Sequence, residues 1–249
     1  MKNIAKFGLT MLFLLLVGVL SVGVGQTAVS AGTNHLLYLP LTLKQNDDPV
    51  PFGPVHSGEG TYYFATGAGN CSFDPSPQNL MVAALNSVDY AGSALCGAFI
   101  EVTGPQGSVV VRIVDQCPGC AEGDVDLSQE AYAEIAELAA GRVDISWQLV
   151  SPVLDGPIVY HFKDGSNQWW TAVQIRNHRN PIAKVEYWNG SSYVDVPRLS
   201  YNYFVETSGM GPGPYTFRVT DTLGNVLMDT DIPHVEDGDV SGGGQFPAP

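Results

Sequence analysis

Residues 158–232 contain no helical period, and this absence restricts the fold more than any other feature of the chain. Short strand-like runs alternate there with turn signals. The turns are marked by Gly, Pro, Asn and Asp, which favour tight chain reversals, at Asp164-Gly165, Asn180-Pro181, Asn189-Gly190, residues 208–214 and Leu223-Gly224-Asn225. About seven short strands at such spacing predict a β-sandwich.

The preceding region, residues 58–150, is also mainly strand-like. Its predicted strands cover residues 61–66, 98–103, 109–114 and 143–150. One helix is predicted over residues 129–140, because Ala131, Ile135 and Leu138 recur at helical spacing behind Ser128, a good N-cap. A short break around residues 151–157 separates the two regions, so the sequence predicts two mainly β domains.

The composition of the chain limits the classes of molecule that it is expected to bind. The 249 residues include 28 Gly and 17 Pro, only 14% are charged, and the formal net charge is −14. The glycine and proline content suits tight turns in an all-β protein with an ordinary apolar fraction. An acidic surface repels nucleic acid and anionic membranes, so we expect neither as a partner. It favours a neutral polysaccharide over an anionic one.

The first 31 residues have the pattern of a signal peptide. Lys2 and Lys6 precede an apolar stretch over residues 9–24, and Val29-Ser30-Ala31 offers a small-x-small cleavage site. The apolar run of about 16 residues is shorter than the ~20 needed to span a membrane. We therefore expect a secreted, extracellular protein that leaves the membrane after cleavage. An uncleaved anchor is the alternative. Residues 32–57 are predicted to form a linker.

Four cysteines lie in the first half of the chain, at Cys71, Cys96, Cys117 and Cys120. An even number in a secreted chain predicts two disulfides, with three connectivities open. We favour Cys71–Cys96 with Cys117–Cys120, because Cys-Pro-Gly-Cys can close on itself in a turn. The spacing contains one Cys-x-x-Cys alone, which disfavours zinc. A redox pair is also disfavoured, because Cys117 follows a strand. No metal or other cofactor is expected.

Two carboxylates stand near the second cysteine pair. Asp115 ends an apolar strand, and Asp126 lies between Val125 and Leu127. Apolar neighbours raise the pKa of a carboxyl group, so the pair could supply the acid and the base of a glycosidase. The alternative is that both carboxylates hold backbone N–H groups in turns, with Asp126 capping the helix.

Several motifs together resemble the expansin family, and the bacterial expansin-like proteins most closely. The resemblance covers residues 58–233 in order and rests on Gly60-Thr61-Tyr62-Tyr63, Val114-Asp115 with Pro118, Asp126-Leu127-Ser128, Trp169-Trp170, Gln174-x-Arg176-Asn177-His178 and Tyr201-Asn202-x-Phe204. It implies a mainly β fold: a six-stranded double-psi β-barrel followed by an immunoglobulin-like β-sandwich. The barrel would occupy residues 58–150, the sandwich 154–235 and a tail 236–249, mobile up to Gln245-Phe246-Pro247.

The resemblance also implies a function and its residues. Thr61, Asp115 and Asp126 would line the floor of a groove in the barrel, with Asp126 the most important. The sandwich would be a family-63 carbohydrate-binding module whose row is Trp169, Trp170 and Tyr201, beside Lys163. Such proteins loosen cellulose-rich walls without hydrolysis. The implied partner is cellulose or a related neutral β-glucan or xylan, and we expect a monomer.

The sequence differs from related barrel proteins at two positions that affect the reaction expected of it. The similar barrel of family-45 endoglucanases begins Thr-x-Tyr-x-Asp, with the Asp as base, whereas this chain has Ala65 at that place. Without a base the inverting mechanism cannot run, so hydrolysis is not expected. Cys117 stands where relatives without cysteines have an aromatic side chain. A lytic enzyme on the same barrel is the alternative, either a family-45-like endoglucanase or a peptidoglycan transglycosylase, which uses a single Asp. A plain binding module is a third possibility.

The tryptophans differ in their expected exposure. Neighbours in a strand alternate faces, so Trp169 would point to the core unless the strand begins after it or bulges there. The resemblance favours an exposed Trp169, with Trp170 on the solvent side beside Gln174 and Arg176. Trp188 is expected as an additional exposed aromatic, and Trp147 as a packed one between Ile145 and Leu149.

Overall fold

The computed structural model describes residues 28–31, 35–38 and 48–249. It divides the chain into residues 1–46 and residues 47–249. In the first part, β1 (Ala28–Ala31) pairs antiparallel with β2 (His35–Tyr38). Most of the predicted signal peptide lies outside the described residues. Within the described ranges, no helix is long and apolar enough to cross a membrane.

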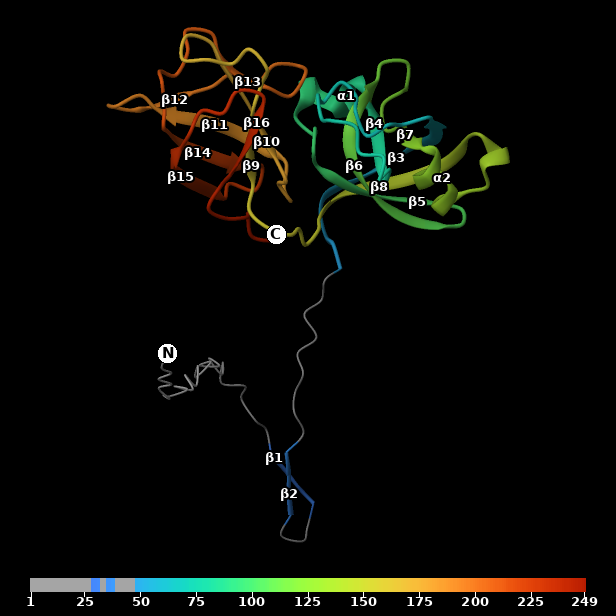
Figure 1. The fold of residues 1–249 in the computed structure, drawn as a ribbon. Coiled ribbons are helices and arrows are strands. Elements are labelled where there is room, and N and C mark those ends of the chain that lie inside the picture. Colours follow the sequence, from blue (N-terminus) through green and yellow to red (C-terminus); the bar gives the residue numbers. More distant parts are fainter. Residues whose placement is uncertain (1–27, 32–34, 39–47) are drawn as a thin grey trace, which may run out of the picture. The chain divides into compact units, whose positions relative to one another are not determined.

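A closed barrel of six strands opens the second part (Figure 1). Its order around the barrel is β3-β7-β4-β6-β5-β8, and β3–β7 and β4–β6 are the parallel pairs. The predicted double-psi barrel is therefore confirmed. The strands are β3 (Val50–Tyr63), β4 (Val82–Asn86), β5 (Phe99–Gly104), β6 (Gly107–Cys117), β7 (Val125–Ser128) and β8 (Val143–Ser151).

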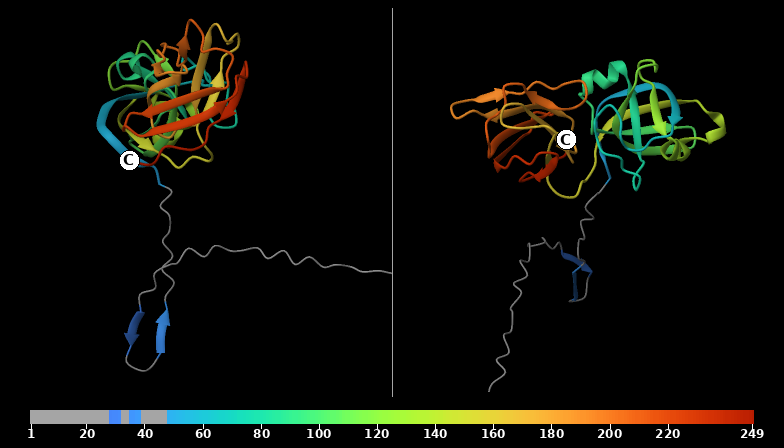
Figure 2. Two further views of the ribbon diagram at one scale, coloured as in Figure 1. Left: turned by 90° about the vertical axis from the view of Figure 1, so that its left-hand side faces the viewer. Right: turned by 45° about the horizontal axis from the view of Figure 1, so that its top comes forward.

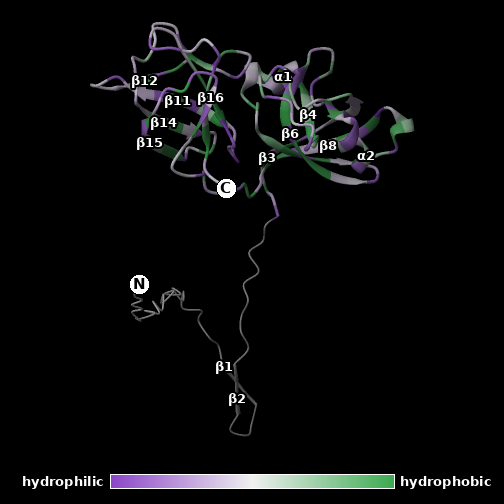
Figure 3. Cartoon of the chain, viewed as in Figure 1, coloured by the Kyte–Doolittle hydropathy of each residue, from purple (hydrophilic) through white to green (hydrophobic). Residues whose placement is uncertain are grey.

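Apolar side chains fill the barrel. Leu85, Ile100, Ile113 and Leu127 are fully buried in one cluster, and hydrophobic stretches follow the strands in Figure 3. Trp147 is 2% exposed, which confirms its predicted packing. Its indole Nε1 donates a hydrogen bond to the Gly123 carbonyl at 2.9 Å, so the buried polar atom is satisfied.

The predicted helix is shorter than expected. Helix α2 (Gln129–Ile135) begins where predicted, since the Ser128 hydroxyl accepts the Ala131 N–H at 3.0 Å. Ala136 is extended and buried, so packing against the core ends the helix, and only the 3₁₀ turn η2 (Leu138–Ala140) follows. Two short elements, α1 (Ser87–Tyr90) and η1 (Ala91–Ser93), are too short to show a sequence period.

The predicted linker over residues 32–57 is wrong in its last part. Strand β3 begins at Val50, and it pairs with β8 from Val50↔Ser151 onward. Its Gly and Pro content is typical of a linker. However, the pairing shifts register between Phe52 and His56, around Pro54, which cannot donate to the ladder. The barrel therefore starts eight residues earlier than the predicted 58.

The predicted β-sandwich is also confirmed, and Figure 2 shows its strands in yellow to red. One sheet has the order β13-β10-β9-β16 and the other β12-β11-β14-β15. The strands are β9 (Val159–Phe162), β10 (Thr171–Arg176), β11 (Ile182–Trp188), β12 (Tyr193–Asp195), β13 (Phe204–Glu206), β14 (Tyr215–Asp221), β15 (Val226–Ile232) and β16 (Gly238–Ser241).

The sequence predicted that the C-terminal tail over residues 236–249 lies outside the sandwich. This prediction is wrong. Strand β16 pairs with β9, and Phe246 is 2% exposed within the sandwich core. The acidic, glycine-rich composition misled the prediction, because an edge strand needs only its backbone groups to extend a sheet. The last strand and Phe246 therefore belong to the second domain.

Candidate functional site

The pairing of Thr61 with Asp126, two of the residues predicted to line a groove, follows from strand register. Strands β3 and β7 are parallel, with Thr61 opposite Asp126. The Thr61 hydroxyl donates to Asp126 Oδ1 at 2.6 Å, and both residues are half-buried. A hydrogen bond this short to a carboxylate fixes the orientation of the acid. The structure thus brings together two of the three groove residues that the sequence suggested.

Burial controls the acidity of Asp126. Burial is the largest of the causes that raise the pKa of this carboxyl group, and the negative charge of Asp115 raises the pKa further. The hydrogen bond from Thr61 acts in the opposite direction, since it stabilises the ionised form. The neighbours Val125 and Leu127 are both fully buried, as the sequence argument required. The alternative role of Asp126 as helix cap is wrong, because Ser128 is the cap.

Asp115 is engaged differently. Its Oδ1 accepts the backbone N–H groups of Asn70 at 2.7 Å and of Gln116 at 2.8 Å. The backbone-binding alternative therefore describes this carboxylate. Gly69 lies so close to the Asp115 side chain that any Cβ there would collide with it, so a glycine is required.

Tyr63 lies near the two acids, and the sequence indicated it only as part of a motif. Its hydroxyl is buried and has no hydrogen-bond partner among the described residues. Burial raises the pKa of Tyr63, and the charges of Asp115 and Asp126 raise it further. The phenol therefore stays protonated beside the two acids. Ala65, at the place of a catalytic base, is half-buried against the barrel core.

The cysteines are all oxidised in the favoured pairing. Cys71 is bonded to Cys96 and Cys117 to Cys120, with Cα–Cα distances of 5.4 and 5.5 Å. The second bond closes the turn that follows β6, the strand that carries Asp115. With their thiols in disulfides, these cysteines cannot serve as metal ligands.

Trp169 is the most exposed of the predicted binding residues, at 73%. It precedes β10, which begins at Thr171, and its N–H donates to the Asn167 side chain at 2.9 Å. The residue therefore lies in a turn, where the alternation of a strand does not apply. This confirms the prediction of an exposed Trp169 and gives its physical reason.

Trp170 and Tyr201 lie together on the outer face of the first sheet. Both are half-buried against a cluster of Ala172, Tyr203 and Val205. The Tyr201 and Tyr203 rings are 5.9 Å apart, and the Lys163 ammonium lies 6.0 Å from the Tyr203 ring. The segments next to β9, β10 and β13 thus bring Lys163, Trp170 and Tyr201 to one cluster, and Trp169 lies next to Trp170 in the turn before β10.

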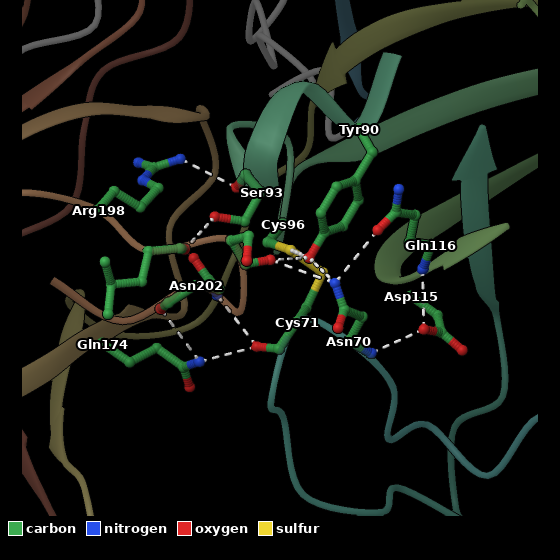
Figure 4. The surroundings of a disulfide bond; sticks show 12 residues. Asn70, Cys71, Tyr90, Ser93, Cys96, Asp115, Gln116, Gln174, Arg198 and Asn202 are labelled. Carbon is green, nitrogen blue, oxygen red and sulfur yellow. Dashed lines mark hydrogen bonds between the residues drawn. A yellow bond between two sulfur atoms is a disulfide. The ribbon is translucent and has the colours of Figure 1, made fainter. Parts of the chain in front are cut away.

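A hydrogen-bonded seam joins the groove to this aromatic side (Figure 4). Asn70, whose N–H binds Asp115, also donates from its side-chain amide to the Ser200 carbonyl at 3.2 Å. The Tyr90 hydroxyl donates to the same carbonyl at 2.8 Å, and burial raises the pKa of Tyr90 to about 12. Ser200 precedes Tyr201. Neither Asn70 nor Tyr90 carries a sequence signal for this role, because the contacts cross between the domains.

The barrel also covers part of the first sheet. Gln174 is fully buried and donates to the Cys71 carbonyl at 2.9 Å, and Asn202 donates to the same carbonyl at 3.3 Å. Arg176 binds the Asp74 carboxylate at 2.8 Å. The expectation of Gln174 on the solvent side beside Trp170 is therefore wrong, since the barrel takes the place of solvent there.

Comparisons with known proteins agree with this arrangement. A family model described as lytic transglycolase matches residues 82–147. Expansin-YoaJ of Bacillus subtilis is 36% identical over 187 residues, covering 72% of this chain and 79% of its own. Expansin-like protein 1 of Dictyostelium discoideum is 30% identical over 217 residues, 81% of this chain and 75% of its own. A mutant Clavibacter michiganensis expansin, crystallised with cellohexaose, has a TM-score of 0.74 and 33% identity, covering 78% of this chain and 100% of that one.

Proposed function

The chain belongs to the expansin family, and from this premise we propose that it binds cellulose or a related neutral β-glucan or xylan and loosens it without hydrolysis. The sandwich would hold the polymer, and the barrel groove would disturb its contacts with neighbouring chains. The observation that carries the proposal is the set of groups around Asp126. The pKa of Asp126 is raised, but Ala65 stands in place of a second, basic carboxylate.

The chemistry of the groove favours holding over cutting. An inverting glycosidase needs an acid and a base on opposite sides of the bond. Asp115 Oδ1 already accepts two backbone N–H groups, which supports a positioning role for this carboxylate. Loss of general base catalysis alone costs about 10²–10⁴-fold in rate. The Thr61–Asp126 pair can still exchange hydrogen bonds with sugar hydroxyls, in competition with the bonds between glucan chains.

The aromatic residues supply the affinity. A pyranose ring has an apolar C–H face that a flat side chain can cover, and an aromatic side chain buries 150–250 Å² in full. If stacking removes about half of that area from water, each ring contributes at most roughly 2.5 kcal/mol. Trp169, Trp170 and Tyr201 are the proposed row, with Lys163 as a hydrogen-bond donor at its side.

The seam explains why the two activities would act on one polymer. Asn70 contacts Asp115 in the groove and the carbonyl of Ser200, next to Tyr201. A glucan held by Tyr201 therefore begins close to the groove. Binding would raise the local concentration of glucan at Asp126 without any new contact there.

The test combines two measurements on filter paper, tensile weakening and released reducing sugar. We expect the wild-type protein to weaken the paper and release no sugar. Asp126→Asn should bind the paper but not weaken it, and Trp170→Ala should bind about tenfold more weakly and weaken the paper less. Asp144→Asn, which removes an exposed carboxylate from β8, is the matched control and should behave as wild type.

Two results would contradict the proposal. Sugar release that disappears in Asp126→Asn would show that the groove hydrolyses glucan. Full weakening by Asp126→Asn would reduce the barrel to a scaffold for a binding module. A peptidoglycan-lytic activity is tested separately: incubation with purified sacculi should give no anhydro-muropeptides.

We further propose that the protein is secreted after cleavage behind Ala31 and acts as an extracellular monomer. The leader pattern, the acidic charge and the wall-loosening family support this. N-terminal sequencing of protein recovered from culture medium should begin at Gly32, and sedimentation should give the mass of one chain. Recovery of the protein in membrane fractions with its N-terminal residues, including Lys2, still attached would favour the uncleaved anchor.

A further inference from the structure

The second sheet of the sandwich has an outer face with no role in the proposed function. Its inner side chains, among them Val185, Phe217 and Val219, are fully buried in the core. The alternate positions therefore point away from the core. They comprise Lys184, Glu186 and Trp188 on β11, Tyr193 and Asp195 on β12, Thr216, Arg218 and Thr220 on β14, and Val226 and Met228 on β15. We call this set the outer face.

An exposed aromatic pair lies at one end of the outer face. Trp188 is 43% exposed and stands opposite Tyr193 in the register of β11 and β12. The two rings are 5.2 Å apart at an interplanar angle of 63°. The Arg218 guanidinium lies 4.2 Å from the centre of the Tyr193 ring. Tyr193 is thus held between Arg218 and Trp188, which leaves the Trp188 indole available to a ligand.

A fixed ionic cluster occupies the centre of the outer face. The Glu186 side chain is 7% exposed, and it accepts hydrogen bonds from Arg218 at 2.6 and 2.7 Å and from Lys184 at 2.7 Å. These bonds, chiefly those from Arg218, lower the pKa of Glu186 to about 2. Lys184 also lies 4.0 Å from Asp195. The cluster holds two positive and two negative groups, so it carries no net charge.

We propose that the outer face is a second carbohydrate-binding surface, specific for a neutral polysaccharide chain that stacks on Trp188 and bonds to the polar groups beside it. A face without net charge on a protein of charge −14 favours a neutral polymer over a polyanion. Its hydrogen-bonding groups are already fixed, so a sugar would not pay to order them. A second copy of the chain fits less well, because stable interfaces have apolar centres, whereas here the ionic cluster lies at the centre and the exposed apolar residues Val226 and Met228 lie on the edge strand β15.

The inference goes beyond the proposed function, because it gives the sandwich two binding sides. The row of Trp169, Trp170 and Tyr201 belongs to the sheet β13-β10-β9-β16, and Trp188 belongs to the other sheet. Two packed sheets place their outer faces on opposite sides of a sandwich. One protein could therefore hold two glucan chains at once and act between neighbouring chains or fibrils.

The test asks whether protein bound to cellulose captures a second, soluble polymer. The full chain is adsorbed on cellulose and incubated with a fluorescent mixed-linkage β-glucan, and the captured label is measured. Trp188→Ala should lower the affinity of this capture about tenfold, as expected for one stacked ring. Adsorption to cellulose should stay within about twofold of wild type, because the first row is untouched. Leu223→Ala, at another exposed apolar residue (41%), is the control and should capture as wild type.

The failure of this inference can be distinguished from failure of the proposed function. In affinity electrophoresis with soluble β-glucan, Trp169→Ala/Trp170→Ala should keep a retardation that a further Trp188→Ala removes. This measurement does not require adsorption to cellulose. Trp188→Phe should retain most of the capture, which excludes misfolding of the β11–β12 hairpin as the cause of any loss.

Two outcomes would overturn the inference. One is capture by Trp188→Ala equal to that of wild type. The other is a wild-type dimer in sedimentation that Trp188→Ala dissociates, which would assign the outer face to a second copy of the chain.

Discussion

The barrel holds its polar residues in place through disulfides and hydrogen bonds. The sandwich, among the residues that the structure describes, presents its aromatic residues without the support of a disulfide. Both disulfides lie in the barrel, and the Thr61–Asp126 and Asn70–Asp115 bonds hold the two acids. In the sandwich, Trp169 is largely exposed and depends on one turn for its position.

This difference agrees with the roles proposed for the two domains. Hydrogen bonds to sugar hydroxyls are directional, so small displacements of a carboxylate weaken them. Stacking on a flat ring tolerates lateral movement, because its free energy depends on the area removed from water. A polar groove therefore needs a rigid frame, and an aromatic row needs exposure more than rigidity.

The largest expected effect concerns the frame. Removal of the Cys71–Cys96 bond, whose loop separates its ends by 25 residues, should cost about 3.5 kcal/mol of unfolding free energy in the chain-entropy account. The Cys117–Cys120 bond spans 3 residues and should contribute about half as much. Guanidinium unfolding of the two double-serine variants measures both. Equal losses would show that loop length does not govern the stability of the barrel.

The next prediction concerns affinity. Trp169→Ala/Trp170→Ala should weaken cellulose binding about 100-fold, since two stacked rings are lost. Asp126→Asn should stay within about twofold of wild type, because the groove contributes few apolar contacts. Adsorption isotherms on microcrystalline cellulose give both values. Phe64→Ala, which removes the 83% exposed ring next to Tyr63, is the matched aromatic control. A larger loss in Asp126→Asn than in the tryptophan variant would reverse the comparison between the domains.

A pH dependence is expected at the junction of the domains. His178 is fully buried beside Gly97 and bonds to the Asn180 carbonyl at 2.8 Å. Burial lowers its pKa from 6.5 to about 4. The folded state therefore holds the neutral form, and the unfolded chain takes up a proton first as pH falls. The contribution of neutral His178 to the free energy of unfolding is therefore complete above pH 6.5 and is lost progressively as the pH falls toward 4.

The measurement is a series of thermal or denaturant unfolding curves between pH 7 and pH 4. Over this range, the free energy of unfolding of the wild type should fall by on the order of 2 kcal/mol more than that of His178→Gln. The same acid sensitivity in both proteins would exclude His178 as its source.

The smallest expected effect lies in the groove. Thr61→Val removes the hydrogen bond that lowers the pKa of Asp126, so this pKa should rise further. Thr61→Ser keeps a hydroxyl and should leave the pKa near that of wild type. Carboxyl ¹³C titration by NMR distinguishes the two variants. An unchanged pKa in Thr61→Val would mean that burial alone sets the acidity of Asp126.

Much of this arrangement could be predicted from local sequence. Turn residues marked the strands of the sandwich, and Val125 and Leu127 indicated the burial of Asp126. The close Cys-Pro-Gly-Cys spacing favoured the observed disulfide pairing. In each case the cause lies within a few residues, so the sequence contains it.

What could not be predicted depends on distant partners. Strand β16 forms because β9 offers a free edge, and the Pro-containing start of β3 forms because β8 pairs with it. Gln174 has the strand position of an exposed residue, yet the barrel covers it. Asn70 joins the two domains through Ser200, 130 residues away, and no local pattern records such a contact.

That last contact has a mechanical consequence. The Ser200 carbonyl is held by both Asn70 and Tyr90, and Asn70 in turn grips Asp115. Under the proposed function, a pull on a polymer attached at Tyr201 would be transmitted along this short chain of bonds to Asp115. Thermal movement of the bound polymer would then supply the energy for separating chains, in place of a chemical fuel.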